Sequence, residues 1–518
     1  MTKHGRTTAS IASLVALGGF LFGFDASVIS GVVSFIVPEF SLNELQVGLV
    51  VGAPTLAGII AALSAGPIAD YVGRKRVLLV LAALYTLSAL GSAFAPNYET
   101  LVAARALGGF AFASLGIAPM YIAEIAPHER RGFFVSFNQF GIMIGFSVAY
   151  FANYFVLELS QSGAGWVSAI GLDQHAWRWM LGLEILPAGF WLLALFFVPE
   201  TPRWLALNGR IEAARDVLRR IRPVERVEST LSEILESGTD AGRSVMDRVC
   251  EILSPRLRLA IVIGVIVGVF QQITGINAVY FYAPSIFEQS GVGTNAAFAQ
   301  ATLIGITNIV FTIIAMLLID RLGRKPLLII GLCGIALSMS LAGYGFQKAT
   351  YELTTSDISE LTAEIDRQAL SGIADVRYDD DLSFKRAVEN AIGEQAARNH
   401  QAEVVQAAIQ VNPKIILIGI LGFVASFALS LGPVMWVLFS EIFPNRVRGF
   451  ALAFCGVFNS IASFFVQFLF PWELANLGNA MTFYLFALMG VVGIVLIQWL
   501  LPETKGKSLE ELEQVMTR

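Results

Sequence analysis

The sequence predicts an all-α integral membrane protein in which twelve membrane-spanning helices form two six-helix pseudo-repeats. The first observation is composition: 55% of the 518 residues are hydrophobic and only 14% are charged. A soluble chain carries about a quarter charged residues, because its surface faces water, whereas lipid excludes charges. The second observation is the number of long apolar segments, and the third is an internal repeat. Together they exclude an ordinary soluble fold.

A membrane-spanning helix needs about 20 largely apolar residues. The first half of the chain, 1–198, contains such segments near 9–36, 45–68, 77–95, 101–123, 133–157 and 177–198. The second half, 257–347 and 413–506, contains them near 257–288, 298–319, 327–347, 413–440, 449–472 and 479–500. The first segment is too long for a cleaved signal peptide and lacks a cleavage site, so it is expected to span the membrane.

Between the halves lies a polar linker, 199–256, with short amphipathic helices expected near 210–222, and a tail, 507–518, follows the last span. Basic residues define the orientation, because loops rich in Lys and Arg stay in the cytoplasm. Loops on the N-terminal side carry 25 of the 35 basic residues, and the loops of the opposite side carry only six, all within 348–412. Both termini are therefore predicted to be cytoplasmic.

Short motifs recur at matching places in the two halves. Asp70-Tyr-Val-Gly-Arg-Lys follows the second span and Asp320-Arg-Leu-Gly-Arg-Lys follows the eighth. Similar pairs begin at Glu124 and Glu441 after spans four and ten, and at Pro199 and Pro502 after spans six and twelve. Parallel repeats of this kind are typical of transporters that bind their substrate between the halves.

The repeat also reveals an insertion. Asp70 and Glu124 are 54 residues apart, whereas Asp320 and Glu441 are 121 apart, and the excess corresponds to 348–412. This extracytoplasmic segment contains twelve acidic and six basic residues. Apolar spacing near 356–374 and 384–410 predicts two or three amphipathic helices outside the membrane. A solvated cap and a lid or partner-docking element are both consistent with this pattern.

Seven motifs occur in family order and spacing, and together the chain resembles the sugar porter family of the major facilitator superfamily. The motifs are Gly18–Gly23 with Asp25, Gly73–Arg76, Arg105–Gly109, Pro199–Leu205, Gln271–Asn277, Gly432–Trp436 and Pro502–Gly506. Within that family the chain is most similar to bacterial xylose–proton and hexose–proton symporters. The resemblance implies the major facilitator fold and a place in a bacterial inner membrane.

A sugar site inside a membrane must replace lost water with amides and hydroxyls, because unsatisfied polar groups there cost several kcal/mol. The seventh span supplies Gln271, Gln272 and Asn277. Gln271 and Asn277 are six residues apart and share a helix face only if the helix bends, which Gly275 permits. Interhelical hydrogen bonding is the alternative role for each amide.

The resemblance implies further sugar contacts from Gln139, Asn308 and Asn459, and stacking of the sugar ring on Trp436. An interfacial tryptophan is the alternative for Trp436, although the residue lies inside a span beside a proline. Two positions depart from the family pattern: Phe146 replaces an amide, and Ser460 replaces a frequent tryptophan. The identity of the sugar therefore stays open.

Asp25 lies within the first span among apolar residues, where an ionised carboxylate must be paired or protonated. The resemblance implies an ion pair between Asp25 and Arg105 that protonation breaks, and a purely structural pair is the alternative. At the cytoplasmic helix ends, the resemblance implies an inner gate, while basic loops also anchor the topology. The gate residues are Asp70, Arg74, Glu124, Arg131, Glu200, Arg203, Asp320, Arg324, Glu441, Arg448 and Glu503.

The predicted function is secondary active monosaccharide–proton symport, with a sugar, a proton and the bilayer as partners. A passive sugar uniporter, a polyol or inositol symporter and a non-transporting sugar sensor remain alternatives. Three cysteines and four histidines are too scattered for a metal, redox or catalytic cluster. No enzymatic activity, cofactor, metal or nucleic-acid partner is therefore expected, and a monomer is the simplest expectation for the oligomeric state.

Overall fold

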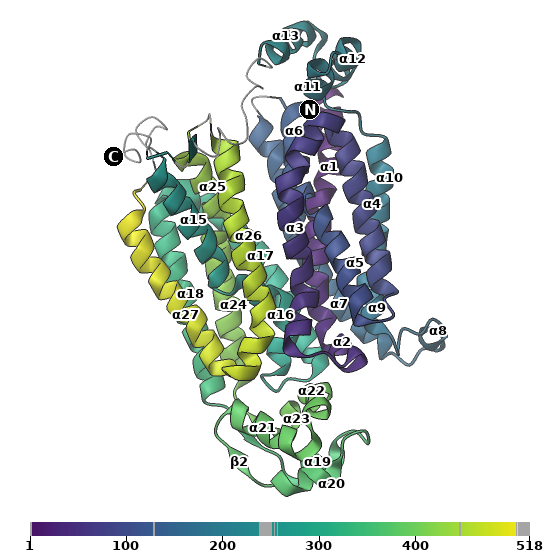
Figure 1. The fold of residues 1–518 in the computed structure, drawn as a ribbon, viewed down its shortest axis with the longest axis vertical. Helices are drawn as coiled ribbons and strands as arrows, with labels where there is room; N and C mark the ends of the chain where they lie inside the picture. The colour runs from purple at the N-terminus through teal and green to yellow at the C-terminus, as the bar shows by residue number, and fades with distance from the viewer. Residues whose placement is uncertain are drawn as a thin grey trace. The chain divides into compact units, whose positions relative to one another are not determined.

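The computed structural model describes residues 3–127, 130–237, 251–252, 254–255, 257–444, 447–503 and 505. The predicted tail 507–518, much of the linker and the side chain of Asp320 lie outside this description. Twelve helical stretches among the described residues are long and apolar enough to cross a membrane. The predicted number of spans is confirmed, and Figure 1 shows the helices in chain order.

Three of the six predicted spans of the first half, the first, fourth and sixth, consist of more than one helix. The chain breaks at 112–113 and again near Glu184, so that spans four and six are each divided in two. The elements are α1 (Lys3–Val28), η1 (Ile29–Gly31), α2 (Val33–Phe40), α3 (Glu44–Val72), α4 (Arg74–Ala93), α5 (Tyr98–Ala111), α6 (Ser114–Ile125), α7 (Arg131–Ser160), α8 (Gly165–Ala169), α9 (Ala176–Gly182) and α10 (Ile185–Phe196).

The second half contains two broken spans, the seventh and the tenth. Gly275 adopts a left-handed conformation with φ of 93° between α15 and α16, and Ser430 separates α24 from α25. The spans are α15 (Arg258–Ile273), α16 (Ile276–Glu288), α17 (Thr294–Leu322), α18 (Arg324–Gln347), α24 (Pro413–Leu429), α25 (Leu431–Ile442), α26 (Arg448–Asn476) and α27 (Asn479–Leu500). The bend that the amide spacing required at Gly275 is present.

Two compact units make up the chain, and they do not coincide with the two halves. Unit 1 comprises 1–27, 53–149 and 178–251, and unit 2 comprises 28–52, 150–177 and 252–518. Residues 28–52 and 150–177 belong to the first half, and the predicted orientation places them at its outer side. Unit 2 thus contains the second half together with the outer ends of several first-half helices.

Glycines bring α1 and α7 into backbone contact in unit 1. A Cβ at Gly23 would lie 2.1 Å from the carbonyl oxygen of Ile142, and one at Gly145 would lie 2.1 Å from that of Phe20. Gly19 faces the backbone of Asn138 in the same way. Because lipid provides no hydrophobic force between helices, such close packing is a major source of their association.

The linker forms short helices at the cytoplasmic ends of the unit 1 helices (Figure 1). They are α11 (Pro202–Leu207), α12 (Ile211–Ile221), η3 (Val224–Arg226) and α13 (Val227–Ser237). Trp204 donates its indole N–H to the backbone oxygen of Asp70 at 2.9 Å, and Arg222 donates to that of Ala126 at 2.6 Å. The amphipathic helix expected near 210–222 is therefore present and is tied to the first half.

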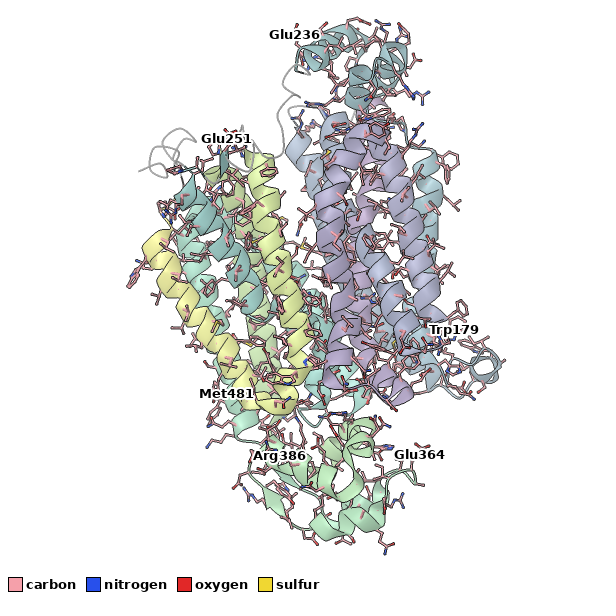
Figure 2. All side chains as sticks on the ribbon, viewed as in Figure 1. Trp179, Glu236, Glu251, Glu364, Arg386 and Met481 are labelled. Carbon is pink, nitrogen blue, oxygen red and sulfur yellow. The ribbon has the colours of Figure 1, made fainter. Side chains whose placement is uncertain are left out.

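The insertion is a small domain with its own apolar core. Tyr351 stacks on Phe384 with ring centroids 5.3 Å apart, and charged side chains such as Glu364 and Arg386 lie on its surface (Figure 2). Amphipathic helices are present, but five short helices replace the two or three expected, and a three-stranded antiparallel sheet of order β2-β1-β3 accompanies them. The elements are β1 (Thr350–Glu352), α19 (Thr355–Glu360), α20 (Arg367–Leu370), η5 (Ser371–Ile373), β2 (Arg377–Tyr378), α21 (Asp381–Ile392), α22 (Glu394–Asn399), α23 (Gln401–Ala408) and β3 (Ile409–Gln410).

Candidate functional site

An ion pair lies inside unit 1. Arg105 on α5 donates from Nη1 to Oδ1 of Asp25 on α1, and the two side chains are 2% and 1% exposed. Gly108, one turn further along α5, leaves space beside them, because a Cβ there would approach the hydroxyl of Ser88 to 2.4 Å. The structure thus brings the two predicted proton-coupling residues together as a buried ion pair.

A third charged residue joins this pair. Glu184, at the break between α9 and α10, is 2% exposed and interacts with both Asp25 and Arg105. Two carboxyl groups and one guanidinium are neutral together only when one carboxyl carries a proton. Sequence reasoning missed Glu184, although an acid inside the apolar segment 177–198 was itself a signal of function.

Unit 2 contains a network of amide side chains where α15 meets α26. Asn459 Nδ2 donates to Gln271 Oε1 at 2.7 Å, and Asn277 Nδ2 donates to Gln272 Oε1 at 2.8 Å. Gln272 Nε2 contacts both Gln271 Oε1 and Asn459 Oδ1 at 3.3 Å. Four predicted sugar-binding residues therefore form one cluster, with donors and acceptors suited to hydroxyl groups.

The network continues along α26 toward its outer end. Asn277 also contacts Ser463 Oγ at 2.6 Å, and Gln467 Nε2 donates to the same oxygen at 2.7 Å. Ser463 and Gln467 were not among the predicted site residues. Their four-residue spacing from Asn459, which places all three on one helix face, was the available signal.

The other predicted sugar contacts lie in different settings. Asn308 on α17 accepts from the Tyr280 hydroxyl at 3.1 Å. Trp436 on α25 is 48% exposed and makes an edge contact with Phe439, so much of its indole surface is free of protein. Gln139 lies on α7 in unit 1 with an exposed side chain, and Phe146 on the same helix packs against Phe22.

Broken helices shape this region of unit 2. A Cβ at Gly275 would lie 2.7 Å from the ring of Phe486, and the positive φ disfavours other residues as well. Gly275 therefore turns the chain so that Gln271 and Asn277 reach the same network. Discontinuous helices that line an internal cavity are a recurring feature of transporter binding sites.

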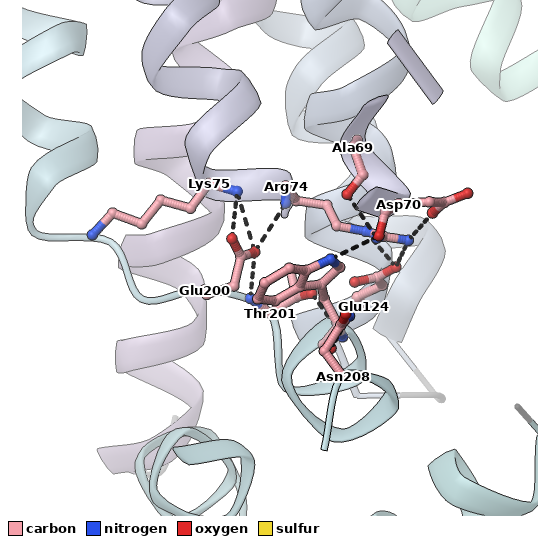
Figure 3. A network of polar contacts seen from close by, with 9 residues as sticks. Ala69, Asp70, Arg74, Lys75, Glu124, Glu200, Thr201 and Asn208 are labelled. Carbon is pink, nitrogen blue, oxygen red and sulfur yellow. Dashed lines mark hydrogen bonds and ion pairs between the residues drawn. The ribbon is translucent and has the colours of Figure 1, made fainter. Parts of the chain in front are cut away.

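The cytoplasmic ends of the first half form a charged corner (Figure 3). Arg74 pairs with Asp70 at 2.7 Å and with Glu124 at 3.1 Å. Glu200 accepts the backbone N–H groups of Arg74 and Lys75, each at 3.1 Å. Glu200 thus binds the N-terminus of α4, where a negative charge is favourable.

The second half has the same corner. Arg324 pairs with Glu441 at 2.7 Å, and Glu503 accepts the backbone N–H groups of Arg324 and Lys325 at 3.1 Å. The remaining predicted gate residues, Arg131, Arg203 and Arg448, form no comparable ion pair among the contacts described. Arg448 donates to the backbone oxygen of Phe443 at 3.2 Å, whereas Arg131 and Arg203 are exposed. The side chain of Asp320 lies outside the described residues.

The outer side of unit 2 is closed by contacts between first-half and second-half segments. Ser34 on α2 donates to Glu288 Oε2 on α16 at 2.7 Å, and the Tyr150 hydroxyl donates to the backbone oxygen of Tyr280 at 2.5 Å. A Cβ at Gly48 would lie 2.0 Å from the backbone oxygen of Phe468. These contacts join residues that are distant in the chain and were not predicted from the sequence.

The fold and its buried polar sites are those of a membrane transporter, and the sequence matches the Sugar (and other) transporter family over residues 11–358 and 396–516. The chain belongs to this family. It is 34% identical to the D-xylose-proton symporter of Escherichia coli (strain K12) over 540 residues, with 97% of this chain and 94% of that protein covered. It is 32% identical to the arabinose-proton symporter of Bacillus subtilis (strain 168) over 507 residues, covering 98% and 94%.

A solved structure, the inward open conformation of the xylose transporter XylE from E. coli, is also similar. Its TM-score is 0.74 at 31% sequence identity, with 98% of this chain and 99% of that chain covered. The structure of XylE bound to 6-bromo-6-deoxy-D-glucose gives a TM-score of 0.68 at 32% identity. The predicted family and fold class are confirmed.

Proposed function

We propose that the protein carries a monosaccharide together with a proton across a bacterial inner membrane by alternating access. The observation that carries this proposal is the presence of two different buried sites in one chain. Unit 1 contains a buried ion pair between a carboxylate and a guanidinium, and unit 2 contains a neutral amide network with donors and acceptors for hydroxyl groups. Relatives named as xylose-proton and arabinose-proton symporters support it. The reaction is movement of the solute and involves no covalent chemistry.

Sugar recognition is assigned to the amide network and Trp436. In the structure Gln271, Gln272 and Asn459 satisfy one another, so a sugar hydroxyl can replace an internal hydrogen bond at little cost. The half-exposed indole of Trp436 offers an apolar plane for the C–H face of a sugar ring. Amides and an aromatic face recognise any polyhydroxylated ring, and the positions of these groups select among sugars.

Proton coupling is assigned to Asp25, Arg105 and Glu184. Protonation of Asp25 removes the charge that holds Arg105 and leaves Glu184 as its remaining partner. Because α1 and α5 carry the two members of the pair, this change alters the contact between the helices. A ligand shifts a conformational equilibrium only through different affinities for its states, and the proton provides that difference here.

The energy available from one proton is sufficient for uphill transport. A charge that crosses a potential of ~150 mV yields about 3.5 kcal/mol, at ~2.3 kcal/mol per 100 mV. That free energy corresponds to accumulation of roughly 300-fold, since each ~1.4 kcal/mol is a factor of ten. The mirrored charged corners are assigned to the inner gate, where they hold cytoplasmic helix ends together in one state of the cycle.

The test is uptake into liposomes that contain the purified protein. Labelled xylose, glucose, galactose and arabinose are supplied with and without an inward proton gradient. Accumulation of one sugar only when the gradient is present is the expected result. Equilibration without accumulation would contradict proton coupling and make the protein a uniporter. Uptake of a polyol or inositol but of no monosaccharide would contradict the proposed substrate class.

A further inference from the structure

The insertion is attached firmly to the second half. Its chain begins at the end of α18 and returns at the start of α24, and a third attachment involves the turn between α26 and α27. Asp381 accepts the backbone N–H of Asn479 at 3.1 Å, and Lys385 pairs with Asp381 at 2.9 Å. A Cβ at Gly478 would come within 2.8 Å of Asp381. The insertion is therefore expected to move with the second half.

One helix of the insertion contacts the first half. Arg398 on α22 donates from Nε to Glu44 Oε1 at 2.9 Å and from Nη2 to Oε2 at 3.3 Å. Glu44 is the first residue of α3, and the two side chains are 21% and 26% exposed. Glu394 contacts the same guanidinium from within the insertion. A guanidinium held at two points by a carboxylate is a geometrically specific ion pair.

Glu44 and Arg398 line a cavity of about 200 Å³. Its walls come from the first-half segment 33–47, from α16 and α26, and from the insertion helices α21, α22 and α23. Ser34 and Glu288, which join the first half to the second, line the same cavity. The insertion thus covers the place where α2 of the first half contacts α16 of the second half at the outer side.

The first half has no counterpart of this domain. The connection between α4 and α5, which corresponds to it in the repeat, consists of residues 94–97. The cytoplasmic corners occur in both halves, whereas the contact between Arg398 and Glu44 occurs only at the outer side. The insertion therefore adds, at the outer side, a contact between the two halves that the internal repeat does not supply.

We propose that the insertion 348–412 is an outer latch, in which Arg398 holds Glu44 and thereby favours the state with a closed outer side. This inference rests on the proposed function, because an alternating-access carrier must separate these two residues in each cycle to admit solute from outside. Breaking a partly exposed ion pair changes such an equilibrium by about threefold. The latch therefore lowers the outward-open population by about that factor.

The test measures access to the cavity from outside. In a protein with Cys250, Cys333 and Cys455 replaced by serine, Ser285→Cys places a thiol in the cavity wall. A membrane-impermeant thiol reagent is applied to right-side-out vesicles without any sugar. Arg398→Gln and Glu44→Gln should each raise the labelling rate about threefold. The control Arg377→Gln removes the same charge from an exposed pair with Asp379 and should leave the rate unchanged.

Equal labelling rates in Arg398→Gln and Arg377→Gln would overturn the latch. A second measurement exchanges the charges: Glu44→Arg combined with Arg398→Glu should restore the slow rate that either single reversal abolishes. A double variant that labels as fast as the single variants would also overturn it. If the protein transports sugar with protons but the Arg398 and Glu44 variants label at the unchanged rate, the latch is disproved and the proposed function stands. If these variants label faster but the protein takes up no sugar, the latch is supported and the proposed substrate is disproved.

Discussion

The two halves of the chain share their cytoplasmic corners but differ in their interiors. Glu200 and Glu503 each accept two backbone N–H groups at the start of an equivalent helix, at the same distance of 3.1 Å. Lys75 and Lys325 each donate to a backbone oxygen at 2.9 Å. At the corners, the repeat is therefore preserved at the level of individual hydrogen bonds.

Inside the membrane the two halves differ in chemistry. The first half buries charges at Asp25, Arg105 and Glu184, and the second half buries neutral amides such as Gln271 and Asn459. Charges respond to protons, whereas amides remain neutral and match hydroxyl groups. In the proposed function this difference is a division of labour, in which the first half senses the proton and the second half recognises the solute.

The largest expected effect follows from neutralising the first-half cluster. Asp25→Asn should abolish gradient-driven accumulation and leave sugar exchange across the membrane intact, because the amide network is unchanged. The measurement is uptake in liposomes with an imposed gradient, followed by counterflow without one. Glu473→Gln, which removes a carboxyl from α26 in the second half, is the matched control. Accumulation by Asp25→Asn would show that the ion pair is only structural.

The next effect concerns the amide network. Gln272→Ala removes a side chain that contacts Gln271, Asn277 and Asn459. Leaving buried polar groups unpaired costs about 1–3 kcal/mol, so sugar affinity should fall roughly 10- to 100-fold. Binding is measured by intrinsic tryptophan fluorescence or calorimetry. Gln347→Ala, an amide at the end of α18, should retain normal affinity. A change of similar size in both variants would argue against a localised site.

A smaller effect is expected at Trp436. Removing an aromatic face costs about 0.5–1.5 kcal/mol beyond lost area, so Trp436→Ala should weaken sugar binding about three- to tenfold. Trp436→Phe should restore most of the affinity. Trp499→Ala, which removes an 81% exposed indole from α27, serves as the control. Unchanged affinity in Trp436→Ala would assign this indole to an interfacial role.

The smallest effect tests the symmetry of the corners. Glu200→Gln and Glu503→Gln each replace a carboxylate that accepts two N–H groups with an amide that is a weaker acceptor. Each should lower the free energy of unfolding by about 1 kcal/mol, because hydrogen bonds to charged groups contribute about 1.5–3 kcal/mol. Thermal unfolding in detergent gives the comparison. Clearly unequal shifts in the unfolding temperature would show that Glu200 and Glu503 stabilise their two corners to different extents.

The sequence predicted the fold well, because bilayer thickness and the exclusion of charge from lipid act on each span separately. The bend at Gly275 followed from the six-residue spacing of Gln271 and Asn277. The break at Ser430 was not foreseen, since the apolar segment 413–440 gives no comparable polar spacing. Single apolar windows show where a helix crosses the membrane and say little about where it is interrupted.

The missed residues act through contacts between distant parts of the chain. Arg398 and Glu44 are 354 residues apart, and neither lies in a recognisable motif. The strands of the insertion are two or three residues long, too short for an alternating pattern. Glu184 was visible as an acid in an apolar segment, yet its partners on α1 and α5 became evident only in three dimensions.

The glycine seam between α1 and α7 has a consequence for engineering. Any side chain at Gly19, Gly23 or Gly145 would force the two backbones apart, so this face tolerates almost no variation. The exposed Gln139 lies on the same helix α7 and is free of that constraint. A library that seeks a new sugar preference should therefore randomise Gln139 and Trp436, the two exposed positions among the predicted sugar contacts, while keeping the three glycines fixed so that the helix pair is not disturbed.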